Sequence, residues 1–215
     1  MIPTSLSTPD QHPYASRGGL KLEAALHAFQ LDPDGLACAD LGCSTGGFVS
    51  CLLHHGAKRV FAVDTAYGEL AWDLRNDPRV VVCERTNALH AKPPAQAAEN
   101  GIDLVSIDLG WTRQDKALPA AMRWLGLAPS KRDRWIVTLI KPHYERPRDT
   151  APRRKGEPRQ PALTDDQSRQ IAQDVLARIQ ADARLGLEPV RHIDSPIHGG
   201  KGGNLEVLAL LRPRG

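Results

Sequence analysis

Short apolar runs of strand character alternate with helical patterns along most of this 215-residue chain. The runs are "LACADLG", "RVFAVD", "RVVVCE", "IDLVSIDL" and "RWIVTLIK", and helical patterns cover Gly47 to Leu53, Tyr67 to Leu74 and Asp115 to Leu125. Strands that are apolar along their whole length need both faces covered, and helices between them supply that cover. The alternation therefore predicts an α/β fold around a mostly parallel sheet.

The chain after Lys141 departs from this pattern. Residues 145–161 are rich in proline and in basic side chains without apolar periodicity, so they are predicted to form a mobile basic loop. A helix capped by Thr164 and running to about Ala183 is expected next. The runs "LEPVRHID" and "NLEVLALLRP" then predict two last strands, joined by the glycine-rich "SPIHGGKGG".

Length, charge and composition narrow the class of protein. We expect a single domain over 1–215 with a flexible N-terminus over 1–14. The net charge of +3 permits an anionic partner without requiring one. The four cysteines form no C-x-x-C pair and are expected to be small buried hydrophobes in a reducing cytosol. Because the chain shows no signal-peptide pattern and no run of about 18 apolar residues, we expect a cytoplasmic protein without a membrane segment.

The stretch "ADLGCSTGGF" after the first run predicts a ligand site. Ligands of open parallel sheets lie beyond the carboxyl ends of strands, near helix N-termini. The stretch lacks the dinucleotide pattern G-x-G-x-x-G, because Ser44 stands where the second glycine belongs, and Asp64 ends the next strand where a carboxylate reaches ribose hydroxyls. These features favour S-adenosylmethionine. The predicted cofactor residues are Asp40, Gly42, Ser44, Thr45, Gly46, Gly47, Phe48, Asp64, Asn87 and Asp108.

Polar or charged side chains also follow the third run and end the fourth and fifth runs. Asn87 follows the third run, so it is expected either to flank the adenine or simply to turn the chain there. Asp108 ends the fourth run and Lys141 ends the fifth, so both charges emerge from the core where the sheet opens to its ligands. A lysine after six apolar residues is expected to have a nearby carboxylate, and Asp108 is the candidate.

An ordered series of motifs identifies a family. "ASRGGLKLEAAL", "DLGCSTGGF", "AVDTAYGEL", "ERTNA", "LIKPHYE" and "SPIHGGKGGNLE" together resemble the FtsJ-like ribose 2′-O-methyltransferases, most closely the TlyA-type branch. The resemblance spans about Ser16 to Leu211. It implies a Rossmann-like class I methyltransferase fold with a seven-stranded, mostly parallel sheet, an antiparallel last strand and helices on both faces. It also implies that S-adenosylmethionine is the cofactor.

The resemblance further implies a catalytic tetrad. The family uses Lys-Asp-Lys-Glu, and the matching positions are Lys21, Asp108, Lys141 and Glu206. By resemblance, Lys141 steers or deprotonates the ribose 2′-hydroxyl, and the other three hold and tune it. A 2′-hydroxyl is a poor nucleophile, so it needs a positioned base in line with the methyl donor.

Two departures from the family concern the RNA. TlyA-type proteins have an N-terminal RNA-binding domain ahead of "SRGG", where this sequence has about fifteen residues. The sequence after Asp108 reads "DLGWTRQ", so Trp111 is expected either to stack on a base or to pack under the next helix. The predicted basic loop over residues 145–161 is expected either to bind RNA phosphates or to remain solvated. The predicted RNA-binding residues are Arg17, Trp111, Arg113, Arg146, Arg148, Arg153, Arg154 and Lys155.

The predicted function is methyl transfer from S-adenosylmethionine to a ribose 2′-hydroxyl of RNA, with ribosomal RNA as the first candidate. One alternative keeps the cofactor and acts on transfer RNA or a small molecule. A second alternative is a non-catalytic RNA-binding protein. No metal is expected, because His143 and His198 lack a third ligand with suitable spacing.

Overall fold

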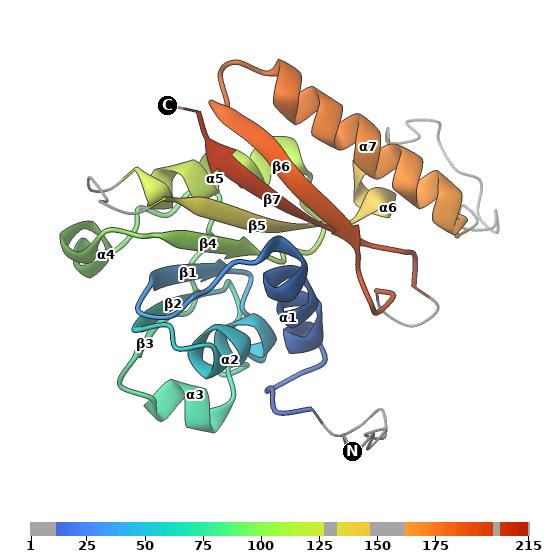
Figure 1. The fold of residues 1–215 in the computed structure, drawn as a ribbon. Helices are drawn as coiled ribbons and strands as arrows, with labels where there is room; N and C mark the ends of the chain where they lie inside the picture. Colours follow the sequence, from blue (N-terminus) through green and yellow to red (C-terminus); the bar gives the residue numbers. More distant parts are fainter. Residues whose placement is uncertain (1–11, 127–132, 147–161, 200–202, 215) are drawn as a thin grey trace, which may run out of the picture.

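The computed structural model describes residues 12–126, 133–146, 162–199 and 203–214. These residues form a sheet with helices on both sides (Figure 1). The strands are β1 (Ala37–Leu41), β2 (Arg59–Val63), β3 (Val80–Cys83), β4 (Leu104–Ile107), β5 (Trp135–Ile140), β6 (Leu187–Asp194) and β7 (Val207–Pro213). The helices are α1 (Gly18–Phe29), α2 (Gly47–His54), α3 (Trp72–Asn76), α4 (Ala95–Asn100), α5 (Gln114–Leu125), α6 (Pro142–Glu145) and α7 (Asp165–Ala181).

The sheet has the strand order β3-β2-β1-β4-β5-β7-β6. Neighbours among β1 to β5 pair in parallel, whereas β7 pairs antiparallel with both β5 and β6. The predicted seven-stranded, mostly parallel sheet with an antiparallel last strand is therefore confirmed. The order reverses between β1 and β4, and such a switch point is where open α/β sheets bind ligands.

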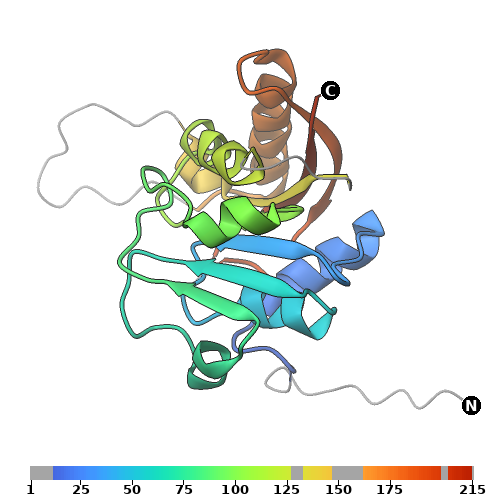
Figure 2. The same cartoon turned by 90° about the vertical axis from the view of Figure 1, so that its left-hand side faces the viewer.

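Helices cover both faces of the sheet (Figure 2), and each face has its own hydrophobic core. In β1, Ala37, Ala39 and Leu41 belong to the core that α5 and α7 cover. Cys38, one residue out of phase, belongs to the core that α1 and α2 cover. Successive side chains of a strand point to opposite faces, so a fully buried strand needs both layers.

Helix α1 was not predicted from the sequence; it packs on α2 and on the last two strands. Its buried residues Leu22, Ala25, Leu26 and Phe29 recur at helical spacing, so the amphipathic pattern was present in the sequence. The predicted helix over Tyr67 to Leu74 begins later, at Trp72 in α3. Tyr67 is exposed and precedes Gly68, whose φ of +77° places it in the left-handed region.

The predicted loop 145–161 does not begin where the sequence analysis placed it. Glu145 is buried and ends α6, where it accepts a hydrogen bond from the backbone N–H of Gln114 at 2.7 Å. Apolar periodicity cannot reveal a single helical turn anchored by a carboxylate. The remainder of the loop from 147 to 161 lies outside the described residues, as do residues 1–11 of the expected flexible N-terminus.

Helix α7 confirms the predicted cap. Thr164 Oγ1 accepts from the N–H of Gln167 at 3.2 Å, and the Gln167 side chain accepts from the N–H of Thr164 at 3.0 Å. This reciprocal capping box satisfies two N–H groups that a helix start otherwise leaves without partners. Val175, Leu176 and Ile179 are buried and lie on the face of α7 that packs on the core.

All four cysteines are free thiols, and Cys38, Cys43 and Cys51 are buried. Burial raises the pKa of each of these three thiols well above its usual value. They therefore remain protonated at neutral pH and act as small apolar side chains.

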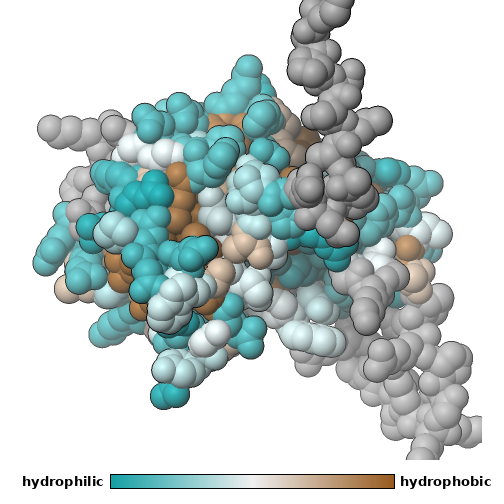
Figure 3. Space-filling model, turned by 90° about the horizontal axis from the view of Figure 1, so that it is seen from below, coloured by the Kyte–Doolittle hydropathy of each residue, from teal (hydrophilic) through white to brown (hydrophobic). Residues whose placement is uncertain are grey.

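None of the described helices has the length and apolar character needed to cross a bilayer. The face shown in Figure 3 is mostly hydrophilic, with apolar residues in small groups. The large apolar side chains that are exposed in the described part of the chain are Tyr67, Trp72, Trp111 and Val190.

Two tryptophans offer a matched test of the core. Trp124 is 1% exposed and packs against Phe61 with ring centroids 5.8 Å apart, whereas Trp72 is 74% exposed. We expect Trp124→Ala to lower the free energy of unfolding by about 3–5 kcal/mol because it leaves a cavity. Trp72→Ala should change it by no more than about 0.5 kcal/mol. Urea denaturation measures both, and equal effects would contradict the assigned core.

Candidate active site

The candidate site begins where β1 and β4 end at the switch point. Gly42 follows β1 with a φ of +94°, and its N–H donates to the carbonyl of Val63 at 2.8 Å. A Cβ at position 42 would lie 2.6 Å from the carbonyl oxygen of Asp108. Only glycine allows the chain to turn here and to approach the end of β4 so closely.

The rest of the glycine loop starts α2. Gly46 has a φ of +96° and occupies the N-cap position without a side-chain cap, so the first N–H groups of α2 are available to a ligand. Gly47 packs against the start of α1, because a Cβ there would lie 2.9 Å from the backbone nitrogen of Gly19. The loop thus fixes α1 and α2 side by side at the carboxyl end of β1.

Asp40 is a buried carboxylate inside this site. It is 1% exposed and lies opposite Ser106 in the β1–β4 register, and Ser106 Oγ donates to Asp40 Oδ1 at 2.7 Å. Among the described residues, Asp40 Oδ2 has no hydrogen-bond partner. Burial raises the pKa of Asp40 to about 7, and the nearby charges of Asp108 and Asp64 add to the rise although the Ser106 hydrogen bond opposes it.

Asp64 ties the ends of β1 and β2 together. Its carboxylate accepts hydrogen bonds from the backbone N–H groups of Ser44 and Ala66, both at 2.8 Å. Ser44 adopts a φ of +46° in this arrangement. Thr65 Oγ1 also donates to Asp64 Oδ1 at 3.5 Å. A carboxylate has about four acceptor positions, so one remains on Oδ2 for a hydroxyl group of a ligand.

Two adjoining cavities occupy the switch point. The first, of about 280 Å³, includes these predicted residues in its lining: Arg17, Lys21, Asp40, Gly42, Ser44, Thr45, Gly47, Phe48 and Asp108. The second, of about 340 Å³, includes Gly42, Ser44, Asp64, Asn87, Asp108 and Trp111. Gly42, Ser44 and Asp108 line both. Every predicted cofactor residue except Gly46, whose role is to start α2, therefore lines one cavity or the other.

The four residues of the predicted tetrad form two ion pairs. Lys141 Nζ lies 2.5 Å from Asp108 Oδ1, and Lys21 Nζ lies 2.5 Å from Glu206 Oε2. All four side chains are largely or partly buried, with 3% to 25% of their surface exposed. The expected pairing of Lys141 with a carboxylate at the end of β4 is thus present in the structure.

The antiparallel insertion of β7 brings Glu206 to this end of the sheet. Ile140 at the end of β5 pairs with Val207 at the start of β7, so Glu206 lies beside the residue that follows β5. The segment before β7 folds over Glu206, because a Cβ at Gly199 would lie 2.3 Å from its Oε1. The glycine-rich run ahead of the last strand is needed for this close approach.

The predicted RNA-binding residues separate into four groups. Trp111 is 85% exposed with a φ of +57°, and its ring lies 5.1 Å from that of Tyr144, so the alternative that it packs under the next helix does not hold. Arg113 instead faces carboxylates, at 3.6 Å from Asp115 and 3.9 Å from Glu145. Arg17 is exposed at the first cavity and Arg146 is half-buried. Arg148, Arg153, Arg154 and Lys155 lie outside the described residues.

Several polar residues near the site make contacts that the sequence did not indicate. Asn87 Oδ1 accepts from the N–H of Leu89 at 3.0 Å, so Asn87 turns the chain there. Asn87 also lines the second cavity, and its place beside the adenine stays a prediction. Ser106, the partner of Asp40, was missed because its place opposite Asp40 follows only from the strand register. His198 lies 3.3 Å from Asp165, and the His143 ring lies 3.9 Å from the Tyr144 ring at an interplanar angle of 54°.

Comparisons with known proteins agree with this geometry. Residues 14–211 match the FtsJ-like methyltransferase family. The 16S/23S rRNA (cytidine-2′-O)-methyltransferase TlyA of Mycobacterium tuberculosis is 40% identical over 205 residues, which cover 95% of this chain and 70% of TlyA. Hemolysin A of Brachyspira hyodysenteriae is 37% identical over 197 residues, which cover 91% of this chain and 75% of hemolysin A.

A solved structure supports the same conclusion. The structure of a hemolysin candidate from Streptococcus thermophilus superposes with a TM-score of 0.77 and 33% sequence identity, and the match covers 96% of this chain and 70% of that one. Family, relatives and fold agree over nearly the whole length. The chain belongs to the FtsJ-like methyltransferase family.

Proposed function

We propose that the protein transfers the methyl group of S-adenosylmethionine to a ribose 2′-hydroxyl of ribosomal RNA in the cytoplasm. The observation that supports this most directly is the Lys141–Asp108 ion pair at the switch point, beside the cavity that Asp108 lines. The ribosomal RNA substrate named for the M. tuberculosis relative supports the acceptor.

The residues at the two cavities fit this cofactor. The unpartnered Oδ2 of Asp40 suits the ammonium group of the methionine part, since a buried carboxylate oxygen needs a donor. The remaining acceptor position of Asp64 Oδ2 suits a ribose hydroxyl. The turn at Asn87 then leaves room for the adenine in the second cavity. When bound, the cofactor supplies an electrophilic methyl group.

The tetrad residues have separate proposed roles. Lys141 orients the 2′-hydroxyl and, in its unprotonated amine form, receives the hydroxyl proton as the new carbon–oxygen bond forms. Asp108 keeps the Lys141 Nζ in place, because it lies 2.5 Å away and itself lines both cavities. Lys21 also lines the first cavity, where its pairing with the buried Glu206 holds its charge toward the acceptor.

Substitution of Lys141 tests this assignment. We expect Lys141→Ala to lower turnover by about 10²- to 10⁴-fold, the usual contribution of a general base, with cofactor affinity nearly unchanged. Lys141→Arg should also fail, since a guanidinium keeps the ion pair with Asp108 but cannot accept a proton. Methyl transfer from labelled S-adenosylmethionine measures both, with Lys116→Ala on the exposed side of α5 as the control. An active Lys141→Arg enzyme would refute the base role.

The pH dependence of cofactor binding tests Asp40. Because the pKa of Asp40 is raised to about 7, the carboxyl is protonated below pH 7 and must lose its proton to pair with an ammonium group. The Kd of S-adenosylmethionine should therefore fall as the pH rises through 7, by up to about tenfold per unit below the pKa, and level off above it. Calorimetric titration measures this. Asp40→Asn keeps the side-chain shape and should bind more weakly without the slope; the same slope in that variant would exclude Asp40 as its source.

Trp111 offers a test of the RNA acceptor. Its exposed ring, backed by Tyr144 and bordering the second cavity, suits an unstacked base of the substrate. We expect Trp111→Ala to raise the KM for RNA by roughly 5- to 100-fold, as the loss of about 1–3 kcal/mol of stacking predicts, and Trp111→Phe to retain most of the affinity. Trp72→Ala is the control for an exposed tryptophan. A loss of cofactor affinity instead would place Trp111 over the adenine.

One assay separates the alternative acceptors. Intact ribosomal subunits, stripped ribosomal RNA and transfer RNA are incubated separately with labelled cofactor. RNA that carries the label at one nucleotide and resists alkaline cleavage there identifies ribose methylation and the RNA class. This labelled product should be absent with Lys141→Ala. Binding of RNA without any label would favour the non-catalytic alternative, and cofactor binding without label in any pool would favour a small-molecule acceptor.

A further inference from the structure

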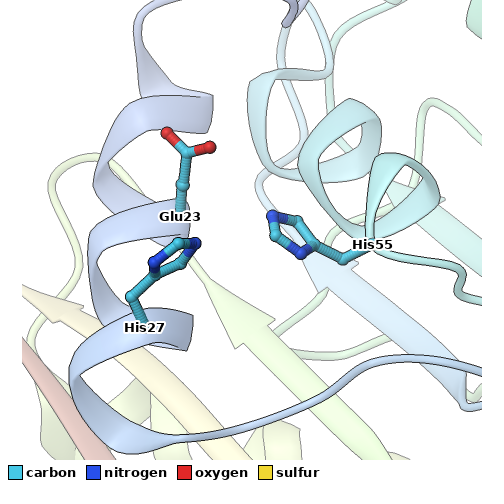
Figure 4. Close-up of side chains that lie close together, drawn as sticks. All are labelled: Glu23, His27 and His55. Atoms are coloured by element: carbon cyan, nitrogen blue, oxygen red, sulfur yellow. The ribbon is translucent and has the colours of Figure 1, made fainter. Parts of the chain in front are cut away.

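Three metal-ligating side chains meet away from the candidate active-site cavities. Glu23 and His27 lie one turn apart on α1, and His55 directly follows α2. One ligand atom from each of the three lies within 4.8 Å of the other two. Figure 4 shows the His27 and His55 rings facing each other across the gap between the two helices, with the Glu23 carboxylate beside them.

The surroundings hold two of these side chains in place. Tyr14, which is buried, donates its hydroxyl to Glu23 Oε1 at 2.6 Å and leaves Oε2 for another partner. The backbone N–H of His55 donates to the carbonyl of Cys51 at 3.0 Å and fixes the backbone of His55 at the end of α2. His55 Nε2 is buried and has no hydrogen-bond partner among the described residues.

We propose that Glu23, His27 and His55 bind a divalent first-row transition-metal ion, with Zn²⁺ as the ion that this donor set suits best. Imidazole nitrogens and a carboxylate oxygen are common Zn²⁺ ligands, at about 2.0–2.2 Å from the ion. Three protein ligands and a water complete a four-coordinate site. His27 is exposed, so its ring can turn by the small amount needed to bring the ligand atoms closer together.

The geometry favours a metal over an ordinary polar cluster. The His27 and His55 rings meet edge to face, with centroids 5.9 Å apart and an interplanar angle of 88°. In the part of the chain that the structure describes, Tyr14 is the hydrogen-bond partner of the Glu23 carboxylate, and His55 Nε2 has none. A carboxylate oriented by a tyrosine hydroxyl has the outer-shell support that metal ligands usually receive. A bound ion would join α1 to the end of α2, and so stabilise the helix that bears Lys21.

Titration of the metal-free full chain with ZnCl₂ tests the site. We expect one ion to bind, and His27→Ala to weaken that binding at least about 100-fold, since it removes one of three ligands from an exposed position that the fold does not need. His192→Ala, which removes an exposed histidine from β6, is the matched control and should bind as the unaltered protein does. Absence of binding, or equal binding by His27→Ala, would overturn the proposal.

A second measurement separates ligation from a structural effect. Co²⁺ in a four-coordinate site absorbs visible light, and this absorption should appear on addition of CoCl₂ and be absent in His27→Ala. The melting temperature should rise with Zn²⁺ in the unaltered protein and in His192→Ala but not in His27→Ala. Tyr14→Phe, a change to a positioning residue, should keep the Co²⁺ absorption with about 10-fold weaker affinity. A Co²⁺ spectrum unaffected by His27→Ala would overturn the site.

Discussion

The pairing of charged side chains at the carboxyl ends of buried strands is the interaction on which this structure depends. Asp40 lies buried within β1, and Asp108 and Lys141 directly follow β4 and β5, whose residues are almost all buried. A charge in such surroundings is tolerated only with a partner, and removal of one member of a buried pair typically destabilises a protein by about 3–5 kcal/mol. Asp108 therefore pairs with Lys141, whereas Asp40 has a hydroxyl on one oxygen only. In the proposed function, Asp40 therefore binds a cationic group of the ligand, whereas Asp108 and Lys141 take part in the reaction.

Two backbone features place these groups within reach of one ligand. The reversal of strand order between β1 and β4 opens the sheet at one point, and Gly42 lets the two strand ends approach there. The antiparallel β7 then inserts next to β5 and brings Glu206 to the same end of the sheet. Lys21 and Glu206 are 185 residues apart in the sequence, yet their ion pair closes the site from the side of α1.

Helix α1 serves two proposed sites because residues two apart on a helix point in different directions. Lys21 faces the first cavity, while Glu23 faces α2 and Tyr14. Leu22 between them is fully buried and anchors the helix in the core. A metal ion bound to Glu23 would stabilise the same helix that positions Lys21, so the proposed metal site could affect the proposed active site through packing alone.

The sequence by itself determined the fold class, the glycine loop and the strand-end acids, whereas the predicted tetrad came from the resemblance to a family. The first three features are local, since apolar runs, turn residues and charges at run ends can be read along the chain. Only the tertiary structure decided which groups meet. The strand register placed Ser106 opposite Asp40, the insertion of β7 gave Lys21 its partner, and the packing of α1 on α2 brought His55 to Glu23 and His27. The physical reason is that contacts between elements depend on strand order and helix packing, which no local pattern in the sequence specifies.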